Sequence, residues 1–169
     1  MTTPVRFALI GKSGSGKSRA AAILSDILGV RHIKTGAICR QIARLLFDNE
    51  NKQSTQRLDD ALTGIDPSIF LRAALRSTSP EEGFVLDALR FRSDLQLARD
   101  CGCLLIRLVA PEAMRVARLQ ARGQAFDPIV DGAHRSEVEL DDVKVDFAIV
   151  NDGEFDLVQR ELSEIASRF

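Results

Sequence analysis

Short apolar runs and amphipathic segments alternate along the chain. Five apolar runs have the length and residue types of buried strands, and they span 5–10, 30–33, 83–88, 103–110 and 145–150. Segments with helical periodicity lie between and after these runs, and their helices are expected to begin near Lys17, Gly36, Asp66, Phe91, Pro111 and Phe155. Strands that alternate with helices are typical of a parallel sheet covered on both faces. We therefore predict a three-layer α/β fold with a five-stranded parallel sheet.

Local residue patterns refine some of these boundaries. The pair Asp66-Pro67 predicts a helix start, with the aspartate as N-cap and the proline in the first turn. Ser136 and Glu139 have the S-x-x-E spacing of a capping box. The segment 124–135 has no firm period and is predicted to be a loop. No helix or strand is predicted for the polar stretch 49–56.

Size and charge limit the kinds of partner that we expect. The chain has 169 residues and a formal net charge of −1 at pH 7, which fits one globular domain. The weak net charge and the lack of tryptophan and tyrosine argue against nucleic acid as a partner. No apolar run has the length of a membrane span, and the first residues do not resemble a signal peptide. With its three cysteines at no metal-ligand spacing, the protein is expected to be cytoplasmic, either a monomer or a homodimer.

A glycine-rich motif lies between the first strand and the first helix. The residues Gly11-x-x-x-x-Gly16-Lys17-Ser18 match the P-loop pattern G-x-x-x-x-G-K-[ST] in full. Glycines let the backbone approach a phosphate closely, and successive N–H groups at a helix N-terminus bind the anion. The expected nucleotide contacts come from Gly11, Ser13, Gly14, Ser15, Gly16, Lys17, Ser18 and Arg19. The motif predicts a P-loop NTPase fold that binds ATP, with Lys17 between the β- and γ-phosphates.

The rest of the chain narrows the class of P-loop protein. Asp87 ends a buried apolar strand, where P-loop proteins hold Mg²⁺, so we predict Ser18 and Asp87 as the magnesium ligands. A GTPase would need an N-K-x-D stretch, but the last strand is followed by V-N-D-G-E. A motor ATPase would usually carry a second acid after Asp87, where this chain has Ala88. These features favour a small-molecule kinase.

Two further stretches resemble adenylate-kinase-type nucleoside monophosphate kinases. In H-I-K-T-G-A-I-C-R, the residues Thr35, Gly36 and Arg40 match the segment that opens the family's acceptor site, with Ala37 replacing its usual acid. In D-A-L-R, Arg90 takes the place of the arginine in the family pattern D-G-x-P-R, whose glycine and proline are missing here. The resemblance implies that Thr35 and Gly36 lie near the acceptor base and that Arg40 and Arg90 bind its phosphate.

Arginines share one side of the helix that follows Pro111. Arg115, Arg118 and Arg122 lie at i, i+3 and i+7, and an anion would relieve their mutual repulsion. This run resembles the helix that leads into the lid of nucleoside monophosphate kinases and dephospho-coenzyme A kinases. The predicted catalytic residues are Lys17, Asp87, Arg118 and Arg122. Arg115 is the weakest candidate of the three arginines.

The stretch H-R-S-E at 134–137 resembles a group of P-loop kinases that includes phage-type deoxynucleoside monophosphate kinases. This resemblance implies that Arg135 is a lid arginine that closes on the phosphates. It also places Asn151, just after the last strand, near the adenine of ATP. His134 and Glu137 are assigned to the solvent-exposed surface, and His32 to packing at a strand end.

Taken together, the resemblance divides a single domain, 1–169, into three parts. The core comprises 1–35, 78–122 and 137–169, the acceptor-binding region about 36–77, and the lid about 123–136. It implies direct in-line transfer of the ATP γ-phosphoryl group to a nucleoside or deoxynucleoside monophosphate, with Mg²⁺. Two alternatives stay open: a kinase of dephospho-coenzyme A or of a modified pyrimidine nucleotide or its DNA polymer, and a catalytically silent nucleotide-binding module.

Overall fold

A five-stranded parallel sheet forms the centre of the molecule. The computed structural model describes residues 4–49, 51–124 and 126–169. The strands are β1 (Arg6–Ile10), β2 (Arg31–Lys34), β3 (Phe84–Asp87), β4 (Leu104–Val109) and β5 (Phe147–Val150). Their order is β2-β3-β1-β4-β5, and every neighbouring pair is parallel. The predicted α/β fold with five parallel strands is confirmed.

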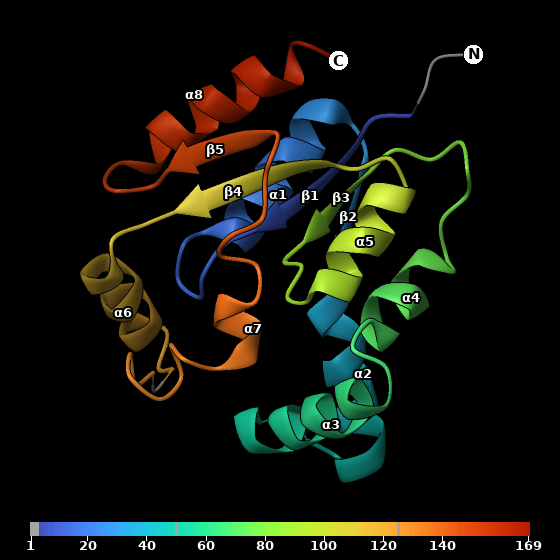
Figure 1. The fold of residues 1–169 in the computed structure, drawn as a ribbon, viewed down its shortest axis with the longest axis vertical. Helices are drawn as coiled ribbons and strands as arrows, with labels where there is room; N and C mark the ends of the chain where they lie inside the picture. Colours follow the sequence, from blue (N-terminus) through green and yellow to red (C-terminus); the bar gives the residue numbers. More distant parts are fainter. Residues whose placement is uncertain (1–3, 50, 125) are drawn as a thin grey trace.

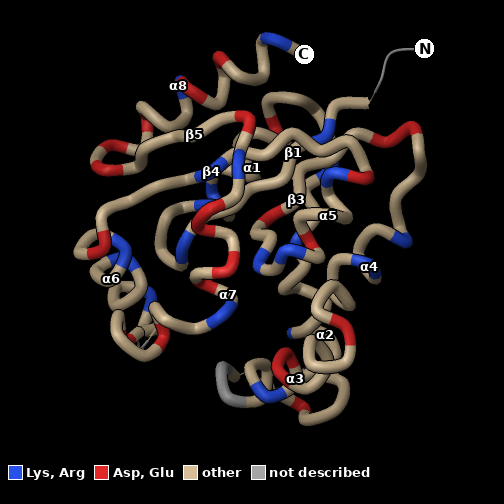
Figure 2. Tube along the Cα trace, in the orientation of Figure 1, with Lys and Arg blue, Asp and Glu red and all other residues tan. Residues whose placement is uncertain are grey.

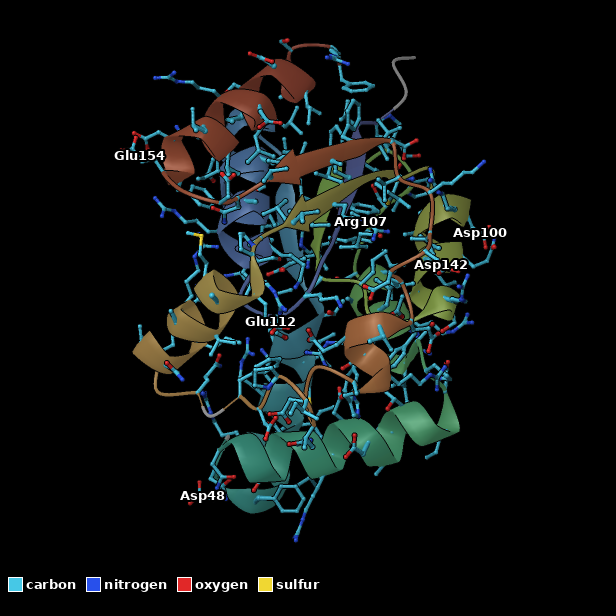
Figure 3. All side chains as sticks on the ribbon, turned by 60° about the vertical axis from the view of Figure 1, so that its left-hand side comes forward. Asp48, Asp100, Arg107, Glu112, Asp142 and Glu154 are labelled. Atoms are coloured by element: carbon cyan, nitrogen blue, oxygen red, sulfur yellow. The ribbon has the colours of Figure 1, made fainter. Side chains whose placement is uncertain are left out.

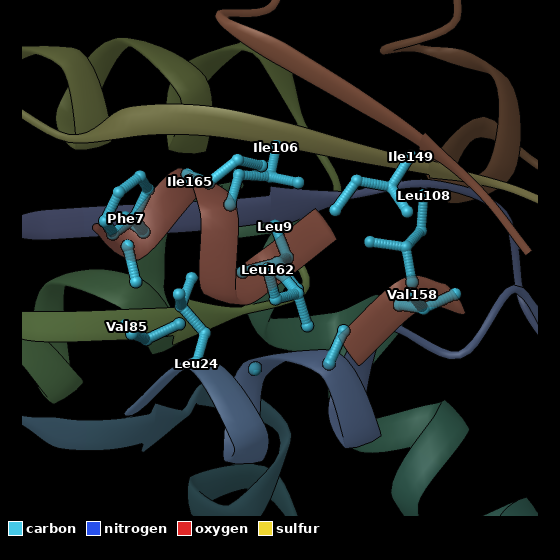
Figure 4. Close-up of a cluster of buried hydrophobic side chains, with 13 residues drawn as sticks. Phe7, Leu9, Leu24, Val85, Ile106, Leu108, Ile149, Val158, Leu162 and Ile165 are labelled. Atoms are coloured by element: carbon cyan, nitrogen blue, oxygen red, sulfur yellow. The ribbon is translucent and has the colours of Figure 1, made fainter. Parts of the chain in front are cut away.

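Helices cover both faces of this sheet (Figure 1). One face packs against α1 (Lys17–Leu28) and α8 (Phe155–Ala166), and Figure 4 shows Leu24 and Leu162 from these helices meeting Leu9 of β1. The other face packs against α4 (Ile69–Leu75) and α5 (Arg92–Asp100). Because β1 is central and buried on both faces, its carboxyl end is a fixed base for the loop that follows it.

Three successive helices form a group at one end of the molecule (Figure 1). They are α2 (Thr35–Phe47), α3 (Lys52–Ile65) and α4, and they pack on one another. On the far side of the P-loop lie α6 (Glu112–Ala121) and the four-residue α7 (Arg135–Val138). Within the described residues, no helix has both the length and the apolar character required to cross a membrane.

The region between α2 and α4 differs from the sequence prediction. The polar stretch 49–56 contains the start of α3, because the Asn51 side chain accepts a hydrogen bond from the Ser54 N–H at 2.9 Å and caps the helix. The prediction that Asp66 is the N-cap of the next helix is wrong. Asp66 ends α3 instead, and its N–H donates to the Leu62 carbonyl. Its carboxylate accepts from the Ser68 N–H at 2.9 Å, so α4 begins only at Ile69.

The predicted capping box of Ser136 and Glu139 is also wrong. α7 begins earlier, at Arg135, and the His134 ring nitrogen accepts a hydrogen bond from the Ser136 N–H. Glu139 instead accepts the Arg92 N–H at 2.8 Å and pairs with Arg135. A tertiary contact with α5 thus competes with the local capping pattern. The predicted loop 124–135 is confirmed where the structure describes it, apart from its last residue.

Candidate active site

The P-loop, residues 11–18, joins β1 to α1 and is held tightly by its neighbours. Gly11 has φ of 142°, and a Cβ there would lie 2.3 Å from the Leu108 carbonyl oxygen. Gly14 has φ of 79°, and a Cβ there would lie 2.6 Å from the Arg115 carbonyl oxygen. These glycines are therefore required by close packing against β4 and α6, in addition to any approach of a phosphate.

Lys17 lies at the start of α1 with its side chain folded over the P-loop. Its Nζ donates to the carbonyl oxygens of Gly11 at 2.6 Å and Lys12 at 2.9 Å. Burial lowers the pKa of Lys17 to about 8, while the carboxylates of Glu137 and Asp87 act in the opposite direction. The ammonium group is therefore held near the loop but is easily deprotonated for a lysine.

The predicted magnesium pair is brought together by neighbouring strands. Ser18 Oγ donates to Asp87 Oδ1 at 3.2 Å, since β3 ends beside β1. Hydroxyl and carboxylate oxygens are the ligands that Mg²⁺ prefers, with phosphate and water oxygens completing the shell, so these residues fit that ion. His32 Nε2 lies 3.4 Å from the other Asp87 oxygen, and burial lowers the pKa of His32 against the pull of that carboxylate. Thr35 Oγ1 donates to the Asp87 carbonyl at 3.5 Å.

Two of the three arginines predicted to share a helix side, Arg115 and Arg118 of α6, contact the P-loop. Arg115 is buried and donates to the Ser13 carbonyl at 3.0 Å, although the sequence made it the weakest candidate. Arg118 donates to the Gly14 carbonyl at 3.4 Å. Arg122, after the last turn, is exposed, and its guanidinium has no hydrogen bond or ion pair with any residue that the structure describes, although its backbone N–H donates to the Leu119 carbonyl at 3.1 Å. The expected shared helix side therefore divides into two arginines at the loop and one in solvent.

Asn151 connects the P-loop to this arginine pair. It is buried after β5, and its side-chain N–H donates to the Ser15 carbonyl at 2.8 Å. Its side-chain oxygen accepts from Arg118 at 3.1 Å. The Arg19 guanidinium lies 4.0 Å from the centre of the Phe155 ring. Asn151 therefore supports the loop structurally, a role that its sequence position did not reveal.

A cleft of about 410 Å³ joins the P-loop to the helices α2 and α3. Its lining includes Ser13, Gly36, Arg40, Asp59, Arg90 and Glu137. Arg40 and Arg90, the two predicted acceptor residues, thus face the same space, and Arg90 Nη1 lies 3.4 Å from Asp59 Oδ2. Burial raises the pKa of Asp59, while Arg90 opposes the shift. Asp59 was missed because the helix that carries it was not predicted.

Arg135, the predicted lid arginine, contacts residues outside the P-loop. Arg135 is exposed, stacks over the Phe91 ring at 4.9 Å and pairs with Glu139, and it does not line the cleft. Two residues further on, Glu137 reaches the P-loop instead and accepts hydrogen bonds from the N–H and hydroxyl of Ser13. The surface position assigned to Glu137 from the sequence is therefore wrong.

Charge is unevenly distributed around the loop. Figure 2 shows basic positions on α6 and acidic positions on the segment from α7 to β5. This acidic segment is fixed to the sheet by Arg107 of β4, which donates to the carbonyls of Leu140 at 2.8 Å and Asp141 at 2.6 Å. Asp142, labelled with Arg107 in Figure 3, pairs with Arg92 of α5 at 2.6 Å. The segment that follows α7 is thus anchored to β4 and α5, and this anchoring holds the Glu137 carboxylate beside the P-loop.

The fold and the intact loop define this chain as a P-loop NTPase-fold protein. The profile of a family described as "AAA domain" matches residues 7–144, and the chain belongs to that family. Two relatives by sequence and one solved structure of the same fold illustrate what the chain is similar to. The chain is 37% identical over 59 residues to a cytidylate kinase of Thermosipho melanesiensis, and the aligned region covers 35% of this chain and 27% of that protein.

An adenylate kinase of Corynebacterium urealyticum is 33% identical over 86 residues, covering 49% of this chain and 46% of that protein. The matched region therefore spans less than half the length of these two relatives. The solved structure of shikimate kinase from Acinetobacter baumannii, in complex with shikimate, superposes with a TM-score of 0.62 at 15% identity. It covers 98% of this chain and 95% of the kinase, and at that identity it indicates the shared fold alone.

Proposed function

We propose that the chain is an ATP-dependent kinase that transfers the γ-phosphoryl group to a nucleoside or deoxynucleoside monophosphate. The single observation that carries this proposal is the cleft that contains Ser13 of the P-loop together with Arg40 and Arg90. A phosphate on the loop and an anionic acceptor at the arginines would share one space. The names of the cytidylate and adenylate kinase relatives support the same class of acceptor.

The nucleotide side of the reaction rests on a small group of residues. Lys17 would place a positive charge beside the β- and γ-phosphates, and the loop N–H groups would bind their oxygens. Ser18 and Asp87 would hold Mg²⁺, which neutralises phosphate charge when bound. Arg118 and Arg115 lie behind the loop and add positive charge near Gly14 and Ser13. These groups stabilise negative charge that develops during transfer.

The acceptor side needs binding and orientation more than proton transfer. An acceptor monophosphate is already largely ionised near neutral pH, so its oxygen can attack without a general base. Arg40 and Arg90 would hold that phosphate in line with the γ-phosphate, and Thr35 and Gly36 would lie near the base. We assign residues 36–77 to acceptor binding and 123–136 to the lid. Arg122 and Arg135 would join the phosphates only after the lid moves.

A hydroxyl acceptor is the second candidate, and Asp59 favours it. This half-buried carboxylate lines the cleft, and its raised pKa suits a group that takes a proton from an alcohol. The solved kinase in complex with shikimate has the same fold, so the fold accommodates acceptors that are not nucleotides. Dephospho-coenzyme A and a modified pyrimidine nucleotide or its DNA polymer remain acceptors to test, beside a catalytically silent nucleotide-binding module.

Steady-state kinetics with a panel of acceptors tests the proposal. The panel contains ribonucleoside and deoxyribonucleoside monophosphates, modified pyrimidine nucleotides, a short DNA, dephospho-coenzyme A and shikimate. Deoxynucleotides are included because H-R-S-E resembles the phage-type kinases. We expect turnover with a nucleoside monophosphate, and a rise of about ten- to a hundredfold in the acceptor KM in Arg40→Ala and Arg90→Ala, because each removes a charged phosphate contact.

Arg76→Ala is the matched control, since Arg76 is an exposed arginine at the end of α4 outside the cleft. It should leave the acceptor KM within about twofold. Turnover confined to a hydroxyl acceptor, and lost in Asp59→Asn, would replace the main proposal by the second one. ATP binding without turnover on any acceptor would instead support a nucleotide-binding module.

A further inference from the structure

Glu137 places a negative charge inside a loop that is built to bind phosphate. Its Oε2 accepts the Ser13 N–H at 2.8 Å, and its other oxygen accepts the Ser13 hydroxyl. Ser13 and Glu137 are separated by 124 positions in the chain, so the contact is tertiary. Arg115 donates to the Ser13 carbonyl at 3.0 Å, so the peptide groups on both sides of the Ser13 Cα are held by side chains from outside the loop. The carboxylate thus holds a backbone N–H that a phosphate oxygen would otherwise use.

The position of Ser13 indicates which phosphate would compete for it. Among residues 11–18, all of which the structure describes, Ser13 alone lines the cleft shared with Arg40 and Arg90. The phosphate that faces the acceptor must be the terminal one of a triphosphate, because that group is transferred. The Ser13 N–H therefore belongs to the γ-phosphate end of the loop, and a diphosphate that occupies the rest of the loop has less need of it.

We propose that Glu137 makes the P-loop selective against a third phosphate while α7 is docked. Its carboxylate occupies the Ser13 N–H and repels the γ-phosphate, so ATP must displace Glu137 whereas ADP need not. Displacement couples ATP binding to movement of α7, whose first two residues are the last two of the lid region 123–136. The proposal rests on the proposed function in two respects: the loop binds adenine nucleotides, and the cleft beside Ser13 is the acceptor side, which the γ-phosphate faces.

A second contact between the same two segments supplies a matched control. Lys12 Nζ pairs with Asp141 Oδ2 at 3.0 Å, and both side chains are substantially exposed. This pair also joins the P-loop to the segment after α7, but it occupies no loop N–H. Loss of the Asp141 charge should therefore loosen docking slightly without freeing the Ser13 peptide.

Isothermal titration calorimetry with ADP and with a non-hydrolysable ATP analogue, at constant Mg²⁺ and without an acceptor, tests the proposal. In Glu137→Gln and Glu137→Ala, the analogue should bind roughly tenfold more tightly, because the negative charge that repels the third phosphate and strengthens the competing contact with Ser13 is removed. ADP affinity should change by less than about twofold, because the diphosphate does not use the Ser13 N–H. In Asp141→Asn, both affinities should stay within about twofold of the unmodified chain.

The possible results separate this inference from the proposed function. If the two Glu137 variants gained equal affinity for ADP and the ATP analogue, or bound the analogue more weakly, the proposed selectivity would be wrong. The kinase proposal would not be affected by either result. If Asp141→Asn gained as much affinity for the analogue as the Glu137 variants, docking of α7 in general, and not the Ser13 N–H, would control affinity. That result would also overturn the proposed selectivity. Binding of neither nucleotide to the unmodified chain would contradict both proposals.

Discussion

The nucleotide side and the acceptor side of the cleft are built in different ways. The P-loop follows the central strand β1, and it is held by β4, by α6 and by Asn151. The acceptor side consists of α2, α3 and α4, which pack largely on one another at one end of the molecule. The closely packed phosphate site therefore faces a separate helical group that carries Arg40, while Arg90 extends from the loop after β3.

This difference explains why one fold can serve several acceptors. Residues expected to meet the phosphates lie in the P-loop and at the start of α1, which pack closely against β4 and α6, so a change in one residue disturbs the packing. Arg40 lies on α2 and Arg90 in the loop after β3, and both side chains are exposed, so they can change at little cost to stability. Chemistry at the loop and choice of acceptor are thus separable properties, and variants on the two sides should affect different constants.

Loss of the P-loop lysine should have the largest effect. In Lys17→Met, turnover should fall by about a thousandfold, since the variant removes a charge beside the transferred group. Lys12→Met is the control, because its side chain is exposed and pairs with Asp141. Turnover of that variant should fall by less than about threefold. A coupled assay of ADP release measures both, and equal losses would remove the distinction between the two lysines.

The same lysine predicts how nucleotide affinity depends on pH. Lys17 is protonated below its pKa of about 8 and loses its charge as the pH rises through that value. Bound phosphates favour the charged form, so ADP affinity should fall above pH 8, by up to about tenfold per pH unit. Lys17→Arg keeps its charge over this range and should show a flatter profile. Calorimetric titrations from pH 7 to 9 would contradict the account if both profiles were equally steep.

A smaller effect is expected where the loop is supported from behind. Asn151→Ala leaves the Ser15 carbonyl without its side-chain donor and removes one of the acceptors of Arg118, so we expect the variant to lose about 1–3 kcal/mol of stability. Asn49→Ala, at an exposed asparagine after α2, should change stability by less than about 0.5 kcal/mol. Urea unfolding monitored by circular dichroism measures both. A stability of Asn151→Ala close to that of the unmodified chain would show that the loop needs no support from β5.

The sequence predicted the nucleotide side better than the acceptor side for physical reasons. The P-loop spacing is local, and Ser18 and Asp87 meet because adjacent parallel strands end at the same edge. Helix α3 was missed because its start depends on one capping side chain, Asn51, in a polar stretch. The Glu137 contact with Ser13 depends on how a distant segment is anchored to β4 and α5, which no local pattern encodes.

The most direct test of the central claim follows the phosphoryl group from one side of the cleft to the other. Phosphorus NMR of ATP, Mg²⁺ and the preferred nucleoside monophosphate would identify the products. We predict that nucleoside diphosphate and ADP form in equal amounts, with no inorganic phosphate, because transfer within the cleft excludes water. Release of inorganic phosphate alone, at a rate independent of the acceptor, would contradict the account.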